Sequence, residues 1–275
     1  GRYGPGVMQP MKDILKLWKK GSVYSKTTTL VFRLAPTINL ATVFFAILMI
    51  PHRNLPGIIS FNGDFVMFAY ILAFGRFFSI IAALDTGSSF EGMGASREAL
   101  FAMLVEPAFF LLIGSLALFT GNTSFISIFK ALHYETNIAF MLGGLATFVL
   151  ILVALIENSR MPVDDPKTHL ELTMIHEVMV LDNSGFDLGT ILYTTNLKFA
   201  MYGALIANFF IGTLPLVVSA LLFFAVQISF AVTVGVVESF IARFRMAHNP
   251  QFILILTSVT MLIFFGVLLV LGKFI

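Results

Sequence analysis

The sequence predicts an all-α membrane protein, a polytopic bundle of about seven transmembrane helices, and two observations predict it. Hydrophobic residues make up 58% of the 275 residues and charged residues only 12%, too few to cover the surface of a soluble protein of this length. The apolar segments are about 17 to 25 residues long and do not alternate with period two. Helices, which satisfy their own backbone hydrogen bonds in lipid, are therefore favoured over barrel strands.

Seven apolar segments define the predicted spans, and the whole chain, 1–275, is interpreted as a single integral membrane domain. The fifth and sixth spans are separated only by a short stretch with Gly212 and Pro215, which predicts a hairpin. The predicted spans are 35–51, 64–84, 99–119, 137–157, 197–212, 214–238 and 251–274.

The first 34 residues form a basic segment that precedes the first span. Within it Met11, Ile14, Leu15 and Trp18 recur at helical spacing, opposite a face of lysines. This pattern predicts a short amphipathic helix that lies on the membrane surface. The alternative interpretation is a solvated loop with a few apolar residues.

The distribution of basic residues predicts the orientation of the bundle. With seven spans, 13 of the 17 lysines and arginines fall on the side of the N-terminal segment. Only Arg53, Lys130 and Lys273 fall on the other side, and Arg76 lies within the second span. Because positive charge is enriched on the cytoplasmic side, the N-terminal segment is expected to be cytoplasmic, in the inner membrane of a prokaryote.

The longest connection, 158–196, is predicted to be an acidic loop on the cytoplasmic side. Asp165 followed by Pro166 is typical of the start of a helix, which we expect to extend from about 166 to 180. Asn183, Ser184 and Gly185 are then expected to turn the chain.

Composition narrows the chemistry that the chain can perform by itself. It contains no cysteine, which excludes thiolate ligands for iron–sulfur clusters. The five histidines fall in predicted loops or helix ends, so no pair of axial haem ligands is expected inside the bundle. His169 and His176 lack the spacing of a zinc protease, and no nucleophile–base motif or nucleic-acid-binding pattern is present. We therefore expect no catalytic residue, metal or redox cofactor in this chain.

Charged residues inside the predicted spans are the first candidates for function, because charge in the bilayer is costly and often marks an ion path. Arg76 lies in the middle of the second span and Glu106 in the middle of the third. They could pair across neighbouring helices, either as part of an ion path or as a purely structural buried pair.

A second set of candidates lies at the expected cytoplasmic face. Glu157 and Glu238 end their spans there, beside six acids of the loop. Like-charged neighbours and burial raise the pKa of carboxyl groups, so such a cluster could hold or pass protons near neutral pH. It could also be a solvated or partner-binding surface. The six loop acids are Asp164, Asp165, Glu171, Glu177, Asp182 and Asp187.

Motifs along essentially the whole chain resemble one known family. This is the membrane subunit shared by respiratory complex I, where it is the first-numbered membrane subunit, and energy-converting nickel–iron hydrogenases of the hydrogenase-4 component C and formate hydrogenlyase type. The segments that carry the resemblance are Gly1–Gly6, Gln9–Leu17, Phe32–Pro36, Leu84–Ser88, Gly94–Glu98, Val105–Pro107 and Glu157–Pro166. The family has eight helices, so the resemblance implies that its first helix is missing here.

The resemblance implies a role in coupling redox chemistry to ion movement. It implies partner subunits that carry iron–sulfur clusters and a large catalytic subunit, with a nickel–iron centre in the hydrogenase branch or a quinone in the complex I branch. Antiporter-like membrane subunits would be neighbours in the bilayer. Together with Arg76 and Glu238, the implied coupling residues are Glu157, Asp164, Asp165, Glu171, Glu177, Asp182, Arg97, Glu98 and Glu106. The implied partner-docking residues are Arg2, Gln9, Asp13 and Arg160.

Departures from the family pattern leave alternatives open. The loop ends in Asp182-Asn183-Ser184-Gly185, whereas complex I members tend to have an acid followed by Tyr-Ser-Gly, and Lys167 and His169 replace acids. These changes weaken the case for a quinone chamber. A stand-alone secondary transporter, which often shows two repeated halves, is the alternative of another class, but no repeat is found. A structural anchor without an ion path is the third alternative.

Overall fold

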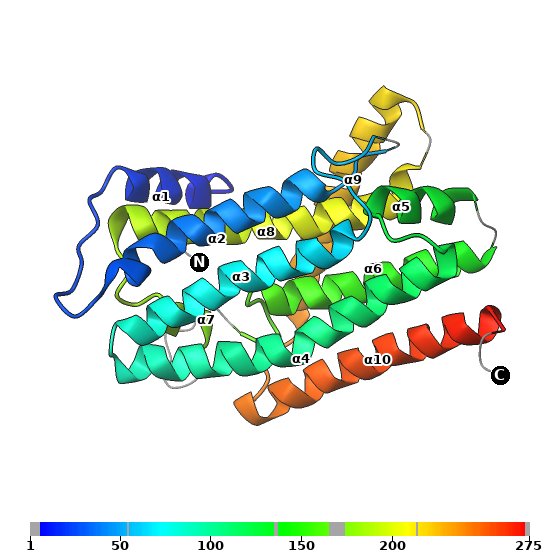
Figure 1. Ribbon diagram of the computed structural model, residues 1–275. Coiled ribbons are helices and arrows are strands. Elements are labelled where there is room, and N and C mark those ends of the chain that lie inside the picture. Colours follow the sequence, from blue (N-terminus) through cyan, green and yellow to red (C-terminus); the bar gives the residue numbers. More distant parts are fainter. Residues whose placement is uncertain (1–5, 54, 135–136, 165–173, 213, 273–275) are drawn as a thin grey trace.

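A computed structural model describes residues 6–53, 55–134, 137–164, 174–212 and 214–272. Long helices run side by side along one direction, and the helical bundle predicted from composition is confirmed (Figure 1). The elements are α1 Gln9–Trp18, α2 Leu30–Met49, α3 Asp64–Asp85, α4 Ser89–Thr120, α5 Phe125–Tyr134, α6 Asn137–Glu157, α7 His176–Met179, α8 Gly185–Ile211, α9 Leu216–Phe240, the 3₁₀ turn η1 Met246–His248, and α10 Asn249–Val270.

Each of the seven predicted apolar segments lies in one long helix. Six helices within the described residues are long and apolar enough to cross a membrane, namely α2, α3, α4, α6, α9 and the helix that ends at Val270. The seventh, α8, falls outside this group because polar residues such as Lys198 and Asn208 interrupt its apolar surface. The expected fifth span, 197–212, is the second half of this helix.

The start of α8 differs from the expectation that 158–196 is one loop. Helix α8 begins at Gly185, so residues 185–196 are helical. The predicted turn is at the right place, since Ser184 is the N-cap residue and Gly185 has a φ of +51°. A Cβ atom at this glycine would also overlap the backbone of Gly21, which explains why glycine is required. Of the helix expected at 166–180, α7 is the only part within the described residues.

The predicted amphipathic helix is α1, and it packs against the N-terminal part of α8. Ile14 is buried, and the ring of Trp18 meets that of Tyr193 edge to face at 5.2 Å between centroids. A Cβ atom at Gly189 would lie 2.8 Å from Trp18 Cδ1, so a glycine here allows the two helices to approach closely.

Helix α5 was not predicted, although its sequence carries a helical pattern. Phe125, Ile128, Phe129 and Leu132 recur at spacings of three and four, and all are buried in the main core. The carboxylate of Asp64, at the start of α3, accepts hydrogen bonds from Phe125 N at 2.8 Å and Ser124 Oγ at 2.9 Å. These bonds fix α5 at the end of the bundle opposite α1 and α7 (Figure 1).

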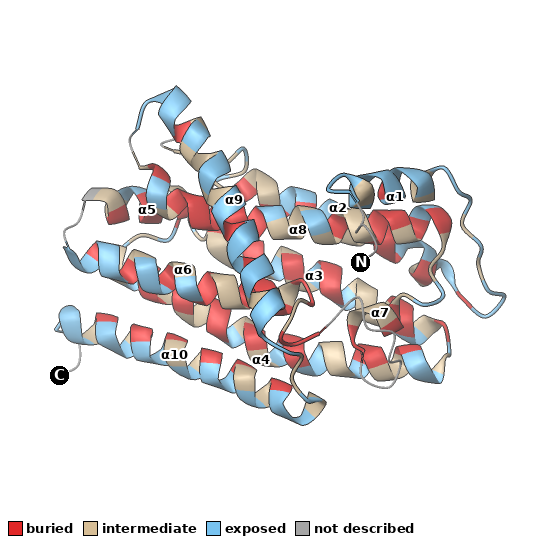
Figure 2. Cartoon of the chain, turned by 180° about the vertical axis from the view of Figure 1, so that it is seen from behind, coloured by how far each residue is buried: buried red, intermediate tan, exposed pale blue. Residues whose placement is uncertain are grey.

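Helix α9 is set apart from the rest of the bundle. It crosses the other long helices and is mostly exposed (Figure 2), and it packs mainly against α8. At the junction, Gln227 Nε2 donates a hydrogen bond to the carbonyl of Ala200 at 3.0 Å. The remaining helices enclose the core, which leaves the interior near α3, α4, α6 and α8 as the place where buried charges gather.

Candidate functional site: a buried cluster of charged residues

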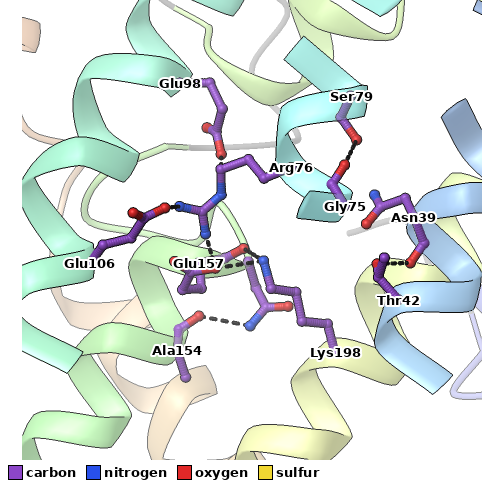
Figure 3. Close-up of polar contacts among 11 residues, drawn as sticks. Asn39, Thr42, Gly75, Arg76, Ser79, Glu98, Glu106, Ala154, Glu157 and Lys198 are labelled. Atoms are coloured by element: carbon purple, nitrogen blue, oxygen red, sulfur yellow. Dashed lines mark hydrogen bonds and ion pairs between the residues drawn. The ribbon is translucent and has the colours of Figure 1, made fainter. Parts of the chain in front are cut away.

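Arg76, in the middle of α3, is the centre of the candidate site. Its guanidinium is buried and meets three carboxylates from two neighbouring helices (Figure 3). Glu157, the last residue of α6, is the nearest partner, through Nη2. Nε lies 3.6 Å from Glu98 and Nη1 lies 3.7 Å from Glu106, both on α4. The predicted pairing of Arg76 with Glu106 is confirmed, and two further acids share the same arginine.

Lys198, on α8, completes the cluster from the other side. Its Nζ atom lies 2.6 Å from Glu157 Oε2, and it donates a hydrogen bond to the backbone carbonyl of Glu157 at 3.0 Å. Glu157 is therefore held between two cations from different helices. The lysine was not predicted as a site residue, because it was expected near the cytoplasmic end of a span, where lysines are common.

The cluster carries three potential negative charges and two positive charges. The Glu157 and Arg76 side chains are 5% and 8% exposed, and that of Lys198 is 15% exposed. Glu106 is the most accessible member, at 42% exposed, and its contact with Arg76 is long for an ion pair. The firmly paired carboxylate is thus Glu157, and the two on α4 are held more loosely.

Four small cavities surround the cluster. The largest, about 50 Å³, is lined by polar groups that include Asn39, Ser79 and Thr194, together with the cluster itself. Smaller ones of about 30, 20 and 10 Å³ share Asn39, Arg76 or Glu157 with it. A polar cavity of about 10–15 Å³ can hold one water molecule, so these volumes suit a few waters. The arrangement can therefore host a short chain of charged and polar groups bridged by water.

Asp164 connects the predicted acidic loop to the bundle. This buried carboxylate accepts hydrogen bonds from the amides of Ile175 and His176, both at 3.1 Å, and forms an ion pair with Arg243 at 2.8 Å. It also lines the small cavity next to Arg76 and Glu157. Asp164 thus lies one cavity away from the cluster and fixes the chain that leads into α7.

Arg97 and Arg160 form the other contacts of the predicted set. Arg97 Nη1 donates a hydrogen bond to the carbonyl of Met174 at 3.0 Å, which ties α4 to the segment before α7. Arg160 pairs with Glu238 on α9 at 3.2 Å and lies over the ring of Phe199. Arg160 and Glu238 are thus joined to each other, whereas neither contacts Arg76.

The remaining predicted residues do not join the cluster. Asp182 is exposed, and Glu177 is partly exposed on α7. Asp187 is buried at the start of α8, where its amide donates a hydrogen bond to Ser22 Oγ at 3.3 Å. Gln9 and Asp13 bond to each other on α1 at 2.8 Å. Arg2, Asp165 and Glu171 lie outside the described residues.

Two further polar residues were missed at this end of the bundle. Tyr202, one turn beyond Lys198, is buried and lines the cavity between Glu106 and Glu157. Glu91, fully buried in the first turn of α4, accepts a hydrogen bond from the amide of Asp182 at 2.9 Å. Neither stands out in the sequence, because one is an ordinary span residue and the other lies in a polar stretch. Within the described ranges, no group of three histidines or acids is arranged to hold a metal ion.

Comparison with known proteins identifies the family. The family model described as NADH dehydrogenase matches residues 1–270. The chain belongs to this family. It is 31% identical to hydrogenase-4 component C of Escherichia coli (strain K12) over 216 residues, which cover 76% of this chain and 65% of that protein. The matched region thus spans slightly less than two thirds of that relative.

Other relatives of this NADH dehydrogenase family member cover more of the chain. It is 29% identical to formate hydrogenlyase subunit 4 of Escherichia coli (strain K12), over 91% of this chain and 83% of that protein. It is also 24% identical to a subunit of the NADH-quinone oxidoreductase of Syntrophotalea carbinolica (strain DSM 2380 / NBRC 103641 / GraBd1), over 77% of this chain and 67% of that protein.

A solved structure shares the fold of this family member. A chain of the membrane-bound sulfane sulfur reductase (MBS), an archaeal respiratory membrane complex, superposes with a TM-score of 0.79 at 19% identity, over 97% of this chain and 88% of that one. The resemblance inferred from the motifs is confirmed, and the protein is an integral membrane subunit related to components of hydrogenases and complex I.

Proposed function

We propose that this chain is the membrane-anchor and proton- or ion-coupling subunit of a complex-I-like, energy-converting complex of the hydrogenase type. The observation that carries the proposal is the buried cluster in which Arg76 and Lys198 hold Glu157, with Glu98 and Glu106 alongside. Buried charge of this kind is costly to maintain, and intramembrane ionisable groups commonly serve ion or proton paths.

The geometry supports a division of roles within the cluster. Glu157 is held by two cations and remains a fixed negative charge. Glu98 and Glu106 lie beyond 3.5 Å from Arg76 and line or border cavities that suit water. These two carboxylates are the groups that would take up and release protons, because neither is committed to a short ion pair.

The loop end of the bundle supports a link to partner subunits. Asp164 and Arg97 tie the segment around Met174–His176 to the bundle, next to the cavity at Glu157. A peripheral subunit that moved this segment would change the field at Glu157 and hence the proton affinity of its neighbours, since charges interact strongly at low dielectric. Exposed residues at this end, including Gln9, Asp13 and Asp182, are the proposed docking positions.

The electron carriers would lie in partner subunits. By likeness to hydrogenase-4 component C and formate hydrogenlyase subunit 4, we propose iron–sulfur subunits, a large nickel–iron subunit and antiporter-like membrane subunits as partners. The loop end would face the cytoplasm of a prokaryote, consistent with the excess of basic residues there.

Isolation of the complex tests this assignment. The chain would be tagged at its C-terminus, purified in mild detergent and analysed for co-purifying subunits, iron and nickel. The proposal predicts iron together with nickel and a hydrogenase-like large subunit. Iron without nickel, together with quinone-reducing activity, would instead favour the complex I branch. A metal-free chain that runs alone would contradict both and favour a transporter.

A further inference from the structure

Helix α1 buries only part of its apolar surface against the bundle. Ile14 is buried, and Leu17 and Trp18 are partly buried where α1 meets α8. Met8, just before the helix, and Met11 and Leu15 within it are 65%, 62% and 46% exposed. Spacings of three and four place these three side chains in one stripe next to the buried face. The apolar arc of α1 is therefore about twice as wide as its contact with α8 requires.

A row of lysines borders the exposed stripe on its other side. Lys12, Lys16, Lys19 and Lys20 are all exposed. Among the described residues, none of these four forms an ion pair with a carboxylate, and the one acid on the helix, Asp13, is bonded to Gln9. In order around the helix, the surface changes from bundle contact to open apolar stripe to uncompensated positive charge.

We propose that this outer surface of α1, formed by Met8, Met11, Leu15 and the four lysines, binds the anionic headgroups and upper acyl region of acidic phospholipids. An apolar stripe flanked by lysines matches the boundary between acyl chains and headgroups. Clusters of basic residues on an amphipathic helix are attracted to acidic leaflets, and the attraction weakens with salt. An acidic protein surface would satisfy the lysines but would not by itself account for the adjoining exposed methionines and leucine.

The position of α1 gives the binding a structural consequence. The helix is not a free tether, because Trp18 packs on Tyr193 and Gly189 of α8. Helix α8 also carries Lys198. A lipid-bound α1 therefore fixes the N-terminal part of the helix that supplies one cation of the buried cluster.

Trp18 makes the proposal directly measurable, because it is the only tryptophan of the chain. The purified full-length chain would be reconstituted into phosphatidylcholine vesicles. A small fraction of the lipid would be either brominated phosphatidylglycerol or brominated phosphatidylcholine, and Trp18 fluorescence would be recorded. We expect several-fold stronger quenching by the anionic lipid at equal fraction, with the preference reduced by 0.5 M salt, a concentration at which screening acts over roughly 4 Å.

The variants separate charge from mere contact. The triple substitution Lys12→Gln, Lys16→Gln and Lys19→Gln should abolish the preference, whereas Lys130→Gln, an exposed lysine at the opposite end, should retain it. Equal quenching by both lipids would overturn the proposal, as would quenching by neither or a preference that survives the triple substitution. The salt series on the unaltered chain provides an independent test if the triple variant fails to fold.

Discussion

Lys198 contacts Glu157 twice, through the carboxylate at 2.6 Å and through the backbone carbonyl at 3.0 Å. One side chain on α8 thus neutralises the acid at the end of α6 and also occupies an orphan carbonyl of that helix terminus. Arg76 contacts the same carboxylate from α3. Three helices are joined through a single carboxylate, which makes Glu157 the structural centre of the cluster.

Replacement of Glu157 with glutamine should destabilise the protein strongly. It leaves Arg76 and Lys198 buried without their shared counter-ion, and the expected loss is about 3–5 kcal/mol in the free energy of unfolding. Thermal unfolding in detergent, followed by fluorescence-detected size exclusion, would measure it. Glu238→Gln is the matched control, since its pair with Arg160 is partly exposed and should cost less than about 1 kcal/mol. Equal losses for the two variants would contradict this account.

Removal of the lysine should rescue part of the loss caused by the glutamine. The double variant Glu157→Gln, Lys198→Met eliminates one of the two uncompensated cations, so it should unfold at a higher temperature than Glu157→Gln alone. A double-mutant cycle would give the coupling energy between the two residues, which we expect within the range of about 0.5–3 kcal/mol seen for contacting pairs. Strict additivity would show that the contact carries no energy.

Gly75→Ala should disturb the position of Arg76. A Cβ atom at Gly75 would overlap Thr42 Oγ1 and lie 2.9 Å from Asn39 Oδ1, so α2 and α3 would be pushed apart next to the arginine. Overpacking of this kind costs about 1–3 kcal/mol. Gly114→Ala on α4 is the control, because nothing lies within 4 Å of its Cβ position. The same thermal shift for both alanines would be the contrary result.

Asp164→Ala should loosen the segment before α7. The variant loses the acceptor for the amides of Ile175 and His176 and the partner of Arg243. Hydrogen–deuterium exchange at these two amides should accelerate, while exchange in α6 remains slow. Asp164→Asn should have a smaller effect, because an amide oxygen can still accept from the backbone. Unchanged exchange in the alanine variant would show that other contacts hold the segment.

Much of the fold follows from the sequence, because lipid allows few solutions. The fourth predicted span, 137–157, has the same bounds as α6, and α3 and α9 differ from prediction by at most two residues at either end. The N-terminal half of α8 was interpreted as loop since Asp187, Thr190 and Asn196 make it polar. In the structure these residues belong to a helix that packs on α1 and borders the loop, where polarity is tolerated.

The site was predictable only in part. Arg76 and Glu106 stand out because mid-span charges are rare, and their contact was expected. Lys198 and Glu98 do not stand out, because each lies near a predicted span end, where a charge is ordinary. Their membership depends on how far α8 and α4 extend and on which faces meet, which are long-range properties that helical periodicity does not encode.

The most direct test of the coupling role is the number of ions moved per electron pair by the assembled complex in proteoliposomes, with Glu106→Gln compared with the unaltered chain. Asp85→Asn is the matched control, because this acid accepts hydrogen bonds from Thr29 at the start of α2, away from the cluster. We predict that Glu106→Gln retains electron transfer in the presence of an uncoupler but lowers the ratio, while Asp85→Asn leaves it unchanged. An unaltered ratio in the Glu106→Gln complex, with assembly intact, would contradict the assignment of this cluster to ion coupling.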